Sequence, residues 1–315
     1  MSSDRKRQID SLGTAAVLAA LLCWSLGPLF IRYLTGYLDA WSQNLWRYIF
    51  AVVFWLPFLF LEIRRGRVPP IVFKRAILPA LSNIVMQVFW AWTFYFVEPG
   101  FASLLSKSSL IWIAIFSLIY FPDERPLVTS WRFWLAILSS VAGLLMVIVT
   151  KHGFTAGANL TGIVLMLSSA FAWAIYIVCV RVSFKDIDSR IGFSAVSLYT
   201  VVALAVMAFL FGRPGRALTL PPWPWACVII SGIVSISLAH TLYYSSMKRI
   251  GVTIPALVLQ LQPFVVLAFS MAIFTERLNF WQWIGGIILV TGSALSIWAQ
   301  QHLGAIKHVP ENTRL

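Results

Sequence analysis

Residues 13–32 read GTAAVLAALLCWSLGPLFIR, and residues 162–181 read GIVLMLSSAFAWAIYIVCVR. Both stretches are apolar, and each begins with Gly, has Trp at its twelfth position and ends with Arg. The matching residues stand 149 positions apart, and Gly143 returns at the same offset as Gly292. The sequence therefore predicts two copies of one structural unit.

The composition excludes an ordinary soluble protein. Of the 315 residues, 60% are hydrophobic and only 11% are charged, whereas soluble domains carry about 25% charged residues. Ten apolar stretches have the length of about 20 residues that a membrane helix needs. We expect an all-α polytopic membrane protein with spans near 14–35, 41–62, 76–97, 100–121, 131–150, 160–181, 191–212, 224–246, 252–274 and 281–300.

The repeat divides these spans equally. Residues 1–150 and 151–300 are expected to hold five spans each, followed by a cytoplasmic tail at 301–315. Because five is odd, the second copy must lie inverted in the bilayer relative to the first. Inverted repeats are typical of secondary transporters, which bind their solute near the midplane at the repeat interface. We therefore expect one transport domain overall.

The net charge is +13, and the basic residues that cause it are distributed in agreement with the predicted topology. Cytoplasmic loops of membrane proteins carry an excess of Lys and Arg. Most basic residues fall on one side of the ten spans, which predicts that both termini are cytoplasmic. The basic balance is better explained by topology and contact with anionic membrane lipid than by nucleic-acid binding.

Two basic residues lie deep within spans. Arg47 is in the second span and Lys107 is in the fourth, each about seven residues from the outer end. A charge in hydrocarbon costs at least about 2.5 kcal/mol, so such residues commonly face a cavity or a partner. The alternative is snorkelling, in which the long stem carries the charge out to the headgroups.

Other polar and aromatic residues mark interior faces. Asn83, Gln87 and Trp90 share one face of the third span, and polar groups on one face of a membrane helix indicate a protein interior or water. Further candidates in the eighth and ninth spans are His240, Tyr244 and Gln260. The alternative for the polar groups is that they only join helices by hydrogen bonds.

Trp24 and Trp173 occupy equivalent positions near the middle of their spans, away from the interfaces where Trp is usually found. They are expected either to line a cavity or to fill the core. No Asp or Glu lies deep in any predicted span. A binding site with two buried cations favours a solute with a carboxylate or phosphate. His240 is the candidate for proton coupling, with a helix-packing hydrogen bond as the alternative.

The chain resembles the EamA branch of the drug/metabolite transporter superfamily. The resemblance rests on Trp24-Ser25-Leu26-Gly27-Pro28 with Arg32, on Arg47, on Trp173 with Arg181, on Leu261-Gln262-Pro263, and on Glu-Arg turns at Glu124 and Glu276. It covers residues 13 to 300. It implies a ten-helix carrier in which spans one to four and six to nine surround a central cavity, with five and ten at the periphery.

The chain departs from the family pattern in its fourth span. Ile111 stands where Pro263 stands in the ninth span, so no kink is expected there. Lys107 is also outside the general pattern. Members of the superfamily export amino acids and other metabolites, or carry sugar nucleotides and phosphorylated sugars.

Our hypothesis from the sequence is a bacterial inner-membrane exporter of a small anionic or zwitterionic metabolite such as an amino acid, working by alternating access. Arg47 and Lys107 would bind the negative group, and Trp24, Trp90 and Trp173 would form the walls. The alternative is a flippase or scramblase, since a cationic cavity also suits a phosphate headgroup. An enzyme is not expected, because the spans hold neither a His-Glu-x-x-His helix nor an acid pair facing a nucleophile.

No cofactor or metal site is expected, and the three cysteines form no Cys-x-x-Cys pair. Gly143 and Gly292 suit close helix packing, either within one subunit or between the subunits of a homodimer.

Overall fold

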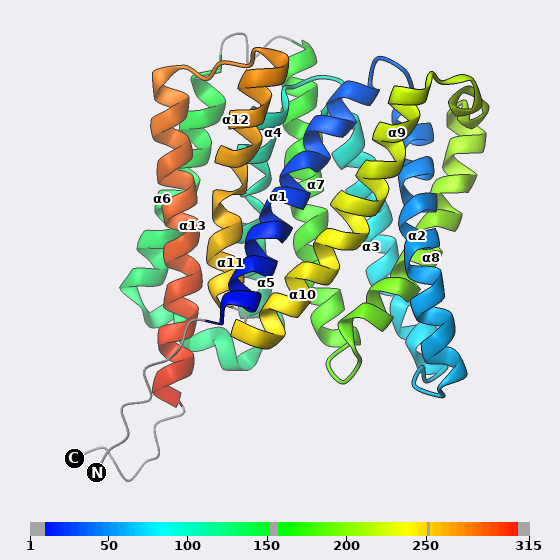
Figure 1. Cartoon of the computed structure of the whole chain (residues 1–315). Helices are drawn as coiled ribbons and strands as arrows, with labels where there is room; N and C mark the ends of the chain where they lie inside the picture. The colour runs from blue at the N-terminus through cyan, green and yellow to red at the C-terminus, as the bar shows by residue number, and fades with distance from the viewer. Residues whose placement is uncertain (1–9, 152–156, 251–252, 308–315) are drawn as a thin grey trace.

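The computed structural model describes residues 10–151, 157–250 and 253–307, and these residues form helices and short connections without strands (Figure 1). The first repeat contains α1 (Ser11–Leu34), α2 (Ala40–Arg64), α3 (Ile71–Thr93), α4 (Pro99–Ser106), α5 (Ser109–Tyr120), η1 (Pro122–Thr129) and α6 (Trp131–Val149). The second contains α7 (Gly157–Ser183), α8 (Ser189–Phe211), η2 (Pro214–Thr219), α9 (Pro222–Ile230), η3 (Ser231–Leu238), α10 (Ala239–Ile250), α11 (Thr253–Val258), η4 (Leu259–Leu261), α12 (Gln262–Phe274) and α13 (Phe280–Lys307).

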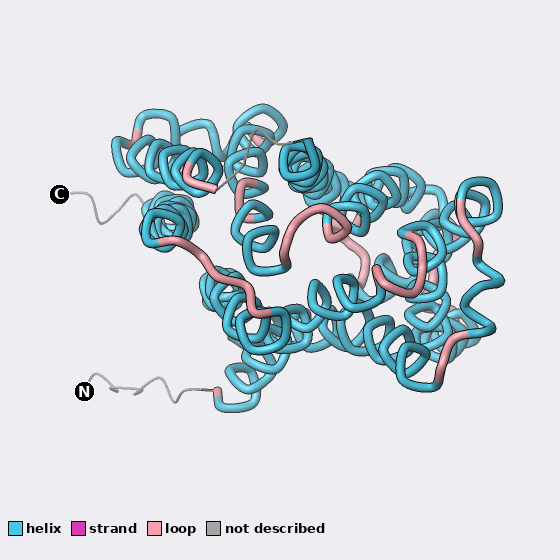
Figure 2. The backbone as a smooth tube through the Cα atoms, turned by 90° about the horizontal axis from the view of Figure 1, so that it is seen from above, coloured by secondary structure: helices cyan, strands magenta, loops and turns pink. Residues whose placement is uncertain are grey.

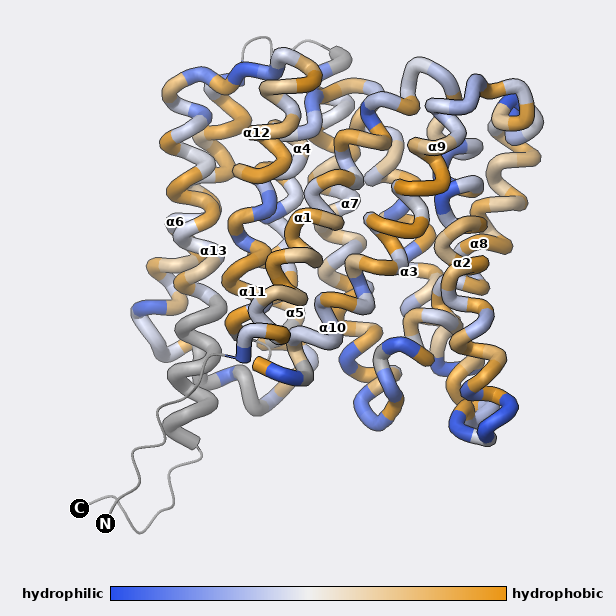
Figure 3. Tube along the Cα trace, in the orientation of Figure 1, coloured by the Kyte–Doolittle hydropathy of each residue, from blue (hydrophilic) through white to orange (hydrophobic). Residues whose placement is uncertain are grey.

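Nine helical segments in the described residues are long and apolar enough to cross a membrane. Three of them are composite: α4 with α5, α9 through α10, and α11 through α12. A tenth helix, α13, has a shorter apolar part at Phe280–Ser296. Figure 3 shows hydrophobic residues along these helices and hydrophilic residues mainly at the two ends of the molecule. The predicted all-α membrane fold is thus confirmed, and α13 continues into the first residues of the expected tail.

The two repeats run through the molecule in opposite directions (Figure 1). We call the end that carries the connections 35–39, 94–98, 212–221 and 275–279 the upper end, as drawn. Helix α1 begins at the lower end, whereas α7 begins at the upper end. The second set of spans is therefore inverted relative to the first.

Basic residues gather at the lower end. The described connections and helix ends there include Arg64, Arg65, Arg67, Lys74, Arg75, Arg125, Arg132, Arg181, Lys185, Arg190 and Arg249, against Arg32, Lys151, Arg213, Arg216 and Arg277 at the upper end. The predicted topology depends on this unequal distribution of Lys and Arg between the two ends, because cytoplasmic loops carry more of them. The lower end is accordingly the one predicted to face the cytoplasm.

Helices α6 and α13 pack against each other at one edge of the molecule, and the view from above places α13 at the rim (Figures 1 and 2). Their contact is built on glycine. A Cβ on Gly143 would lie 2.4 Å from the backbone nitrogen of Leu289, and one on Gly292 would lie 2.7 Å from that of Ser140. These glycines therefore serve packing within one chain, as the first of the two predicted alternatives holds.

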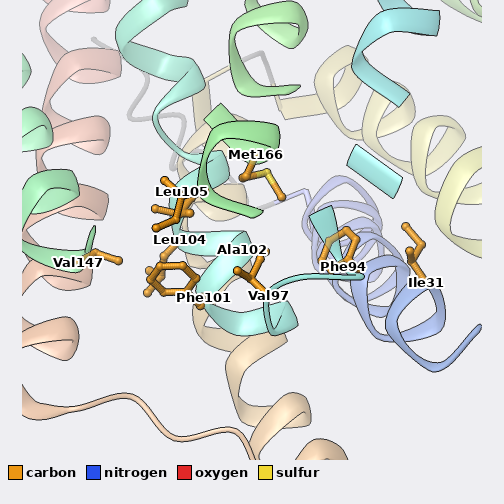
Figure 4. Packing of buried hydrophobic residues seen from close by; sticks show 10 residues of the cluster. Ile31, Phe94, Val97, Phe101, Ala102, Leu104, Leu105, Val147 and Met166 are labelled. Carbon is orange, nitrogen blue, oxygen red and sulfur yellow. The ribbon is translucent and has the colours of Figure 1, made fainter. Parts of the chain in front are cut away.

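The short helix α4 lies in the main apolar core. Phe101, Leu104 and Leu105 on α4 are almost fully buried and belong to one cluster with Met166 of α7 and Val147 of α6 (Figure 4). Burying large apolar side chains contributes about 1.5 to 3 kcal/mol each. Helix α4 is thus held firmly, although it is only eight residues long.

Candidate functional site

The fourth span is broken in the middle. Helix α4 ends at Ser106 and α5 begins at Ser109, and the chain between them tightens into bonds from the N–H of Leu110 to the carbonyl of Lys107 (3.1 Å) and from Ile111 to Ser108 (3.0 Å). These are the i to i−3 bonds of a 3₁₀ turn. The fourth span is therefore interrupted although it lacks the proline of the ninth span, whereas its expected lack of a kink stays a prediction.

The ninth span is broken at the equivalent level. Helix α11 ends at Val258, and the 3₁₀ turn η4 leads into α12, in which Pro263 is near the first position. Proline has no N–H and fits the first turn of a helix. The kink predicted from Pro263 is thus present, and both repeats place a helix break near the centre of the molecule.

Lys107 joins the two breaks. Its Nζ donates to the carbonyl oxygen of Leu259 at 3.0 Å and to Oε1 of Gln262 at 3.2 Å. The residue is 9% exposed, and no carboxylate of the described residues forms an ion pair with it. Lys107 and Leu259 stand 152 positions apart, the same offset as Glu124 and Glu276. A cation of one repeat therefore bonds to the equivalent position of the other.

Gln262 extends this contact to the first span. Its Nε2 donates to the backbone carbonyl of Trp24 at 3.4 Å. The amide thus bridges Lys107 and α1 by accepting from one and donating to the other. Gln262 was not among the predicted binding residues, although a glutamine directly before a membrane-helix proline is a signal for a polar group at a break.

The side chain of Trp24 belongs to an aromatic cluster. Its ring lies 5.0 Å from that of His240, nearly perpendicular, and 5.1 Å from that of Tyr243. His240 stacks on Phe193 at 4.2 Å and lies 6.0 Å from Tyr244. Trp24, His240, Tyr243 and Tyr244 are only partly buried. We call these four residues the aromatic cluster.

Tyr243 was not predicted, but its position three residues after His240 places it on the same helical face. Nδ1 of His240 contacts the carbonyl oxygen of Ile236 within the same helix. Because a carbonyl only accepts, Nδ1 carries the proton and Nε2 is left as an acceptor. The histidine therefore has a hydrogen-bond partner in its own helix.

Arg47 lies elsewhere, between α2 and η3. Its Nε donates to Oγ of Ser231 at 3.0 Å, the residue is 3% exposed, and its Nη1 is buried without a partner in the described part of the chain. A Cβ on Gly232 would lie 2.4 Å from the Arg47 carbonyl oxygen, so α2 and η3 approach closely. No contact among the described residues joins Arg47 to Lys107. The structure therefore gives two separate buried cations.

The predicted polar face of the third span contacts neighbouring helices. Nδ2 of Asn83 donates to the hydroxyls of Tyr48 (3.1 Å) and Thr200 (2.9 Å). The backbone carbonyl of Gln87 accepts from Asn44 at 2.7 Å, and the Gln87 side chain is partly buried. Asn83 thus joins α2, α3 and α8, as the helix-joining alternative holds.

The remaining predicted residues make no hydrogen bond to Lys107 among the bonds of the described residues. Trp90 packs edge-on against Phe94 at 5.0 Å, and Trp173 packs against Tyr176 at 5.3 Å. Gln260 donates from Nε2 to the carbonyl of Ala256 at 3.4 Å, whereas its buried Oε1 has no partner in the residues the structure describes.

A groove of about 700 Å³ opens beside the fourth span rather than at the aromatic cluster. Its walls are mostly apolar, and one of its few polar groups is Ser108, whose buried Oγ has no partner among the described residues. The groove is lined from α3, α5, α6 and α7, including Val85, Phe89, Trp112, Leu144, Val164 and Phe171. The groove therefore reaches the residue next to Lys107 from the side.

The described residues contain no group of three or more His, Cys, Asp or Glu side chains placed to hold a metal ion.

Comparison with known proteins supports the repeat and the fold. The EamA-like transporter family matches residues 11–149 and again residues 160–298. The chain belongs to the EamA-like transporter family. The two matches begin 149 residues apart, which is also the offset between Gly13 and Gly162.

Individual relatives of this EamA-like protein are distant. An uncharacterized transporter of Archaeoglobus fulgidus (strain ATCC 49558 / DSM 4304 / JCM 9628 / NBRC 100126 / VC-16) is 24% identical over 290 residues, covering 90% of this chain and 96% of that protein. A solved crystal structure superposes with a TM-score of 0.64 at 19% identity, covering 92% of this chain and 98% of that one. The structural likeness supports the fold alone. The EamA-like protein is thus an integral membrane protein of a transporter family.

Proposed function

We propose that this EamA-like protein carries a small solute with a carboxylate or phosphate group across the membrane by alternating access. The single observation that carries the proposal is Lys107. Its ammonium group is buried where two broken helices of opposite repeats meet, and its bonds go to two neutral oxygens. A buried cation of this kind favours an anionic partner, since charge-assisted hydrogen bonds are about twice as strong as neutral ones.

The surroundings of Lys107 suit a transported solute. Repeat interfaces with broken helices are where secondary transporters bind their solutes. Gln262 contacts both Lys107 and the backbone of Trp24, so the cation lies next to the span that carries part of the aromatic cluster. The partly buried rings of that cluster offer flat apolar walls for the rest of the solute. Arg47 provides a second cation at the boundary of α2 and η3.

The orientation and direction complete the proposal. The basic lower end would face the cytoplasm of a bacterial inner membrane, with both termini on that side. The direction would be export, as the family resemblance implies. Each subunit contains a complete set of these residues, so transport by a monomer is sufficient for the proposal.

A second candidate function is lipid flipping, and the lateral groove favours it. The groove is apolar and ends at Ser108, next to the Lys107 cation. Such an arrangement would accept an acyl chain in the groove and a phosphate headgroup near Lys107. The two functions differ in whether the solute enters from water or from the bilayer.

The test is a paired measurement on the purified protein in liposomes. Uptake of radiolabelled amino acids, organic acids and sugar phosphates is measured beside leaflet exchange of a labelled anionic phospholipid. We expect uptake of an anionic or zwitterionic solute, which unlabelled solute competes for, without lipid exchange. Lipid exchange without solute uptake would reject the metabolite carrier and support the flippase.

A further inference from the structure

Glu276 belongs to the second repeat but caps a helix of the first. It lies in the connection between α12 and α13, and its carboxylate accepts from the backbone N–H groups of Gly100 at 2.8 Å and Phe101 at 2.7 Å. The hydroxyl of Ser270 donates to the same carboxylate at 2.5 Å. These N–H groups form the start of α4, where a negative charge is stabilised by the helix dipole. Glu276 therefore caps a helix that lies far from it along the chain.

The sequence around this contact is adapted to it. A Cβ on Gly100 would lie 2.6 Å from Cδ1 of Leu267 and 2.8 Å from a Glu276 oxygen, so only glycine admits the carboxylate. Thr275 has a φ of 55°, and among the described residues it is the one non-glycine residue in the left-handed region. Such a conformation is uncommon and costs energy for a β-branched residue. The backbone at Thr275 therefore adopts an energetically unfavourable conformation directly before Glu276.

The acidic residue at the normal capping position does not replace Glu276. Glu98 precedes α4 directly, but its side chain makes no capping bond to the helix. Instead, its Oε1 accepts from Nη2 of Arg32 at 2.7 Å. The two glutamates thus lie at the same helix end with different partners. Of these two glutamates, it is Glu276, which is 5% exposed, that bonds α4 to the second repeat.

Helix α4 is consequently attached to the second repeat at both ends. Glu276 holds its N-terminus, and directly after its C-terminus Lys107 bonds to Leu259 and Gln262. The helix is short and its side chains are packed into the core (Figure 4). A displacement at Glu276 would therefore be transmitted to Lys107 along about two turns of helix.

Bonds between the repeats differ in burial, and at the upper end they include an exposed one from the backbone N–H of Arg213 to Asp39. At the upper end, the Glu276 contacts are buried, and Nε1 of Trp46 donates to the Pro214 carbonyl at 3.0 Å. At the lower end, the ion pair of Asp10 and Arg249 spans 3.3 Å between side chains that are 36% and 42% exposed. Exposed ion pairs contribute little. The buried Glu276 contacts therefore hold α4 to the second repeat at the upper end.

We propose that Glu276 is a positioning residue for the Lys107 site, which holds α4 in place while the carrier is closed at its upper end. Release of α4 from Glu276 opens the site toward that end. This inference rests on the proposed alternating-access function. It adds a specific contact that must break and form in each cycle.

The experiment measures access to α4 from each side of the membrane, without any solute. Cys23, Cys179 and Cys227 are replaced by serine, and Ser103→Cys places a single thiol on α4. Ser103 is 2% exposed and lies one turn before Lys107. A membrane-impermeant thiol reagent is then applied either to the upper or to the lower end in liposomes of known orientation.

Glu276→Gln is the decisive variant, and Glu98→Gln is its matched control at the same helix end. The amide keeps the shape but replaces one accepting oxygen with an NH2 group, which cannot accept from the N–H and hydroxyl donors, so the closed arrangement is weakened. We expect labelling from the upper end to rise about tenfold in Glu276→Gln, as loss of a charge-assisted hydrogen bond implies. We expect labelling from the lower end, and labelling of Glu98→Gln from the upper end, to stay near the background rate.

A residue with a merely structural role would loosen the fold and raise labelling from both ends. Equal labelling from both ends, or no change in Glu276→Gln, would therefore overturn the inference. If Glu276→Gln does not fold, Ser270→Ala removes one of the three donors and should show a smaller rise at the upper end. Because the assay contains no solute, failure of the anion-carrier proposal would appear only in the uptake measurement.

Discussion

The fourth and the ninth spans are equivalent in the two repeats, yet they solve the same structural problem differently. The ninth span breaks at η4 beside Pro263, whereas the fourth breaks at Lys107 and Ser108 without proline. A helix break leaves backbone carbonyls without partners. In the ninth span, the carbonyl of Leu259 is satisfied by Lys107 of the fourth. Both repeats have a helix break at this position, but only the first has a lysine there, because Leu259 is the equivalent of Lys107. The comparison shows how this one difference places a positive charge where the two breaks meet.

The strongest way to break this comparison is to remove the cation. Lys107→Met keeps the length of the side chain but leaves no positive charge at the junction. We expect the apparent affinity for an anionic solute to fall about a hundredfold, since hydrogen bonds to charged groups contribute about 1.5 to 3 kcal/mol. Uptake kinetics in liposomes check this expectation. Lys74→Met, at an exposed position of the lower end, should keep the affinity of the unchanged protein, and equal affinities for both variants would contradict the account.

Next in size is the effect of closing the space at the start of α4. Gly100→Ala places a methyl group against Leu267 and Glu276, so the fourth span loses its attachment to the ninth. We expect a loss of about 1 to 3 kcal/mol in stability, the usual cost of overpacking. Thermal unfolding in detergent measures it. Gly215→Ala is the control because no atom lies within 4 Å of its Cβ position, and a similar loss there would reject the explanation.

A smaller effect is expected at the amide that joins the two breaks to α1. Gln262→Leu removes the acceptor of Lys107 and the donor to the Trp24 carbonyl. We expect a roughly tenfold loss of solute affinity, corresponding to about 1.4 kcal/mol. Thr291→Val on the exposed side of α13 is the matched control, since Thr291 bonds only within its own helix. An unchanged affinity in Gln262→Leu would show that the amide is no part of the site.

The smallest effect sharpens the comparison instead of breaking it. Pro263→Ala should leave the ninth span broken, because the fourth span is broken without proline. Proline at the start of a helix removes an N–H that the helix does not use. We therefore expect a change in stability below about 1 kcal/mol, the usual size of a proline effect at a compatible position, and nearly unchanged uptake. A large loss of either would mean that the two breaks have different physical causes.

Much of the fold follows from periodicity and length. The offset of 149 residues between Gly13 and Gly162 predicted the repeat, and the lengths of the apolar stretches predicted the spans. Both properties can be read from the order of residues alone, without knowing which residues touch. The glycines at 143 and 292 predicted close packing, although only the structure shows that they pack α6 on α13. Whether the basic lower end faces the cytoplasm stays a prediction.

The site was less accessible to sequence reasoning. Lys107 could be identified because a charged residue in an apolar span is conspicuous. Trp24 could be identified because Trp173 occupies the equivalent position in the second repeat. The break at Lys107 was missed since no Gly or Pro marks it, and it depends on Leu259 and Gln262 from far along the chain. The cap of α4 by Glu276 was missed for the same reason. Contacts between repeats are set by the three-dimensional arrangement and leave no local pattern.

The most direct test of the account is a thermal-shift screen of the purified protein against amino acids, organic acids, sugar phosphates and a short-chain phospholipid, repeated on Lys107→Met and Arg47→Ala. A ligand that binds the folded protein raises its stability with occupancy. The account predicts stabilisation by an anionic or zwitterionic metabolite that is lost in Lys107→Met. Stabilisation that survives in Lys107→Met, or that comes only from phospholipid, would contradict it.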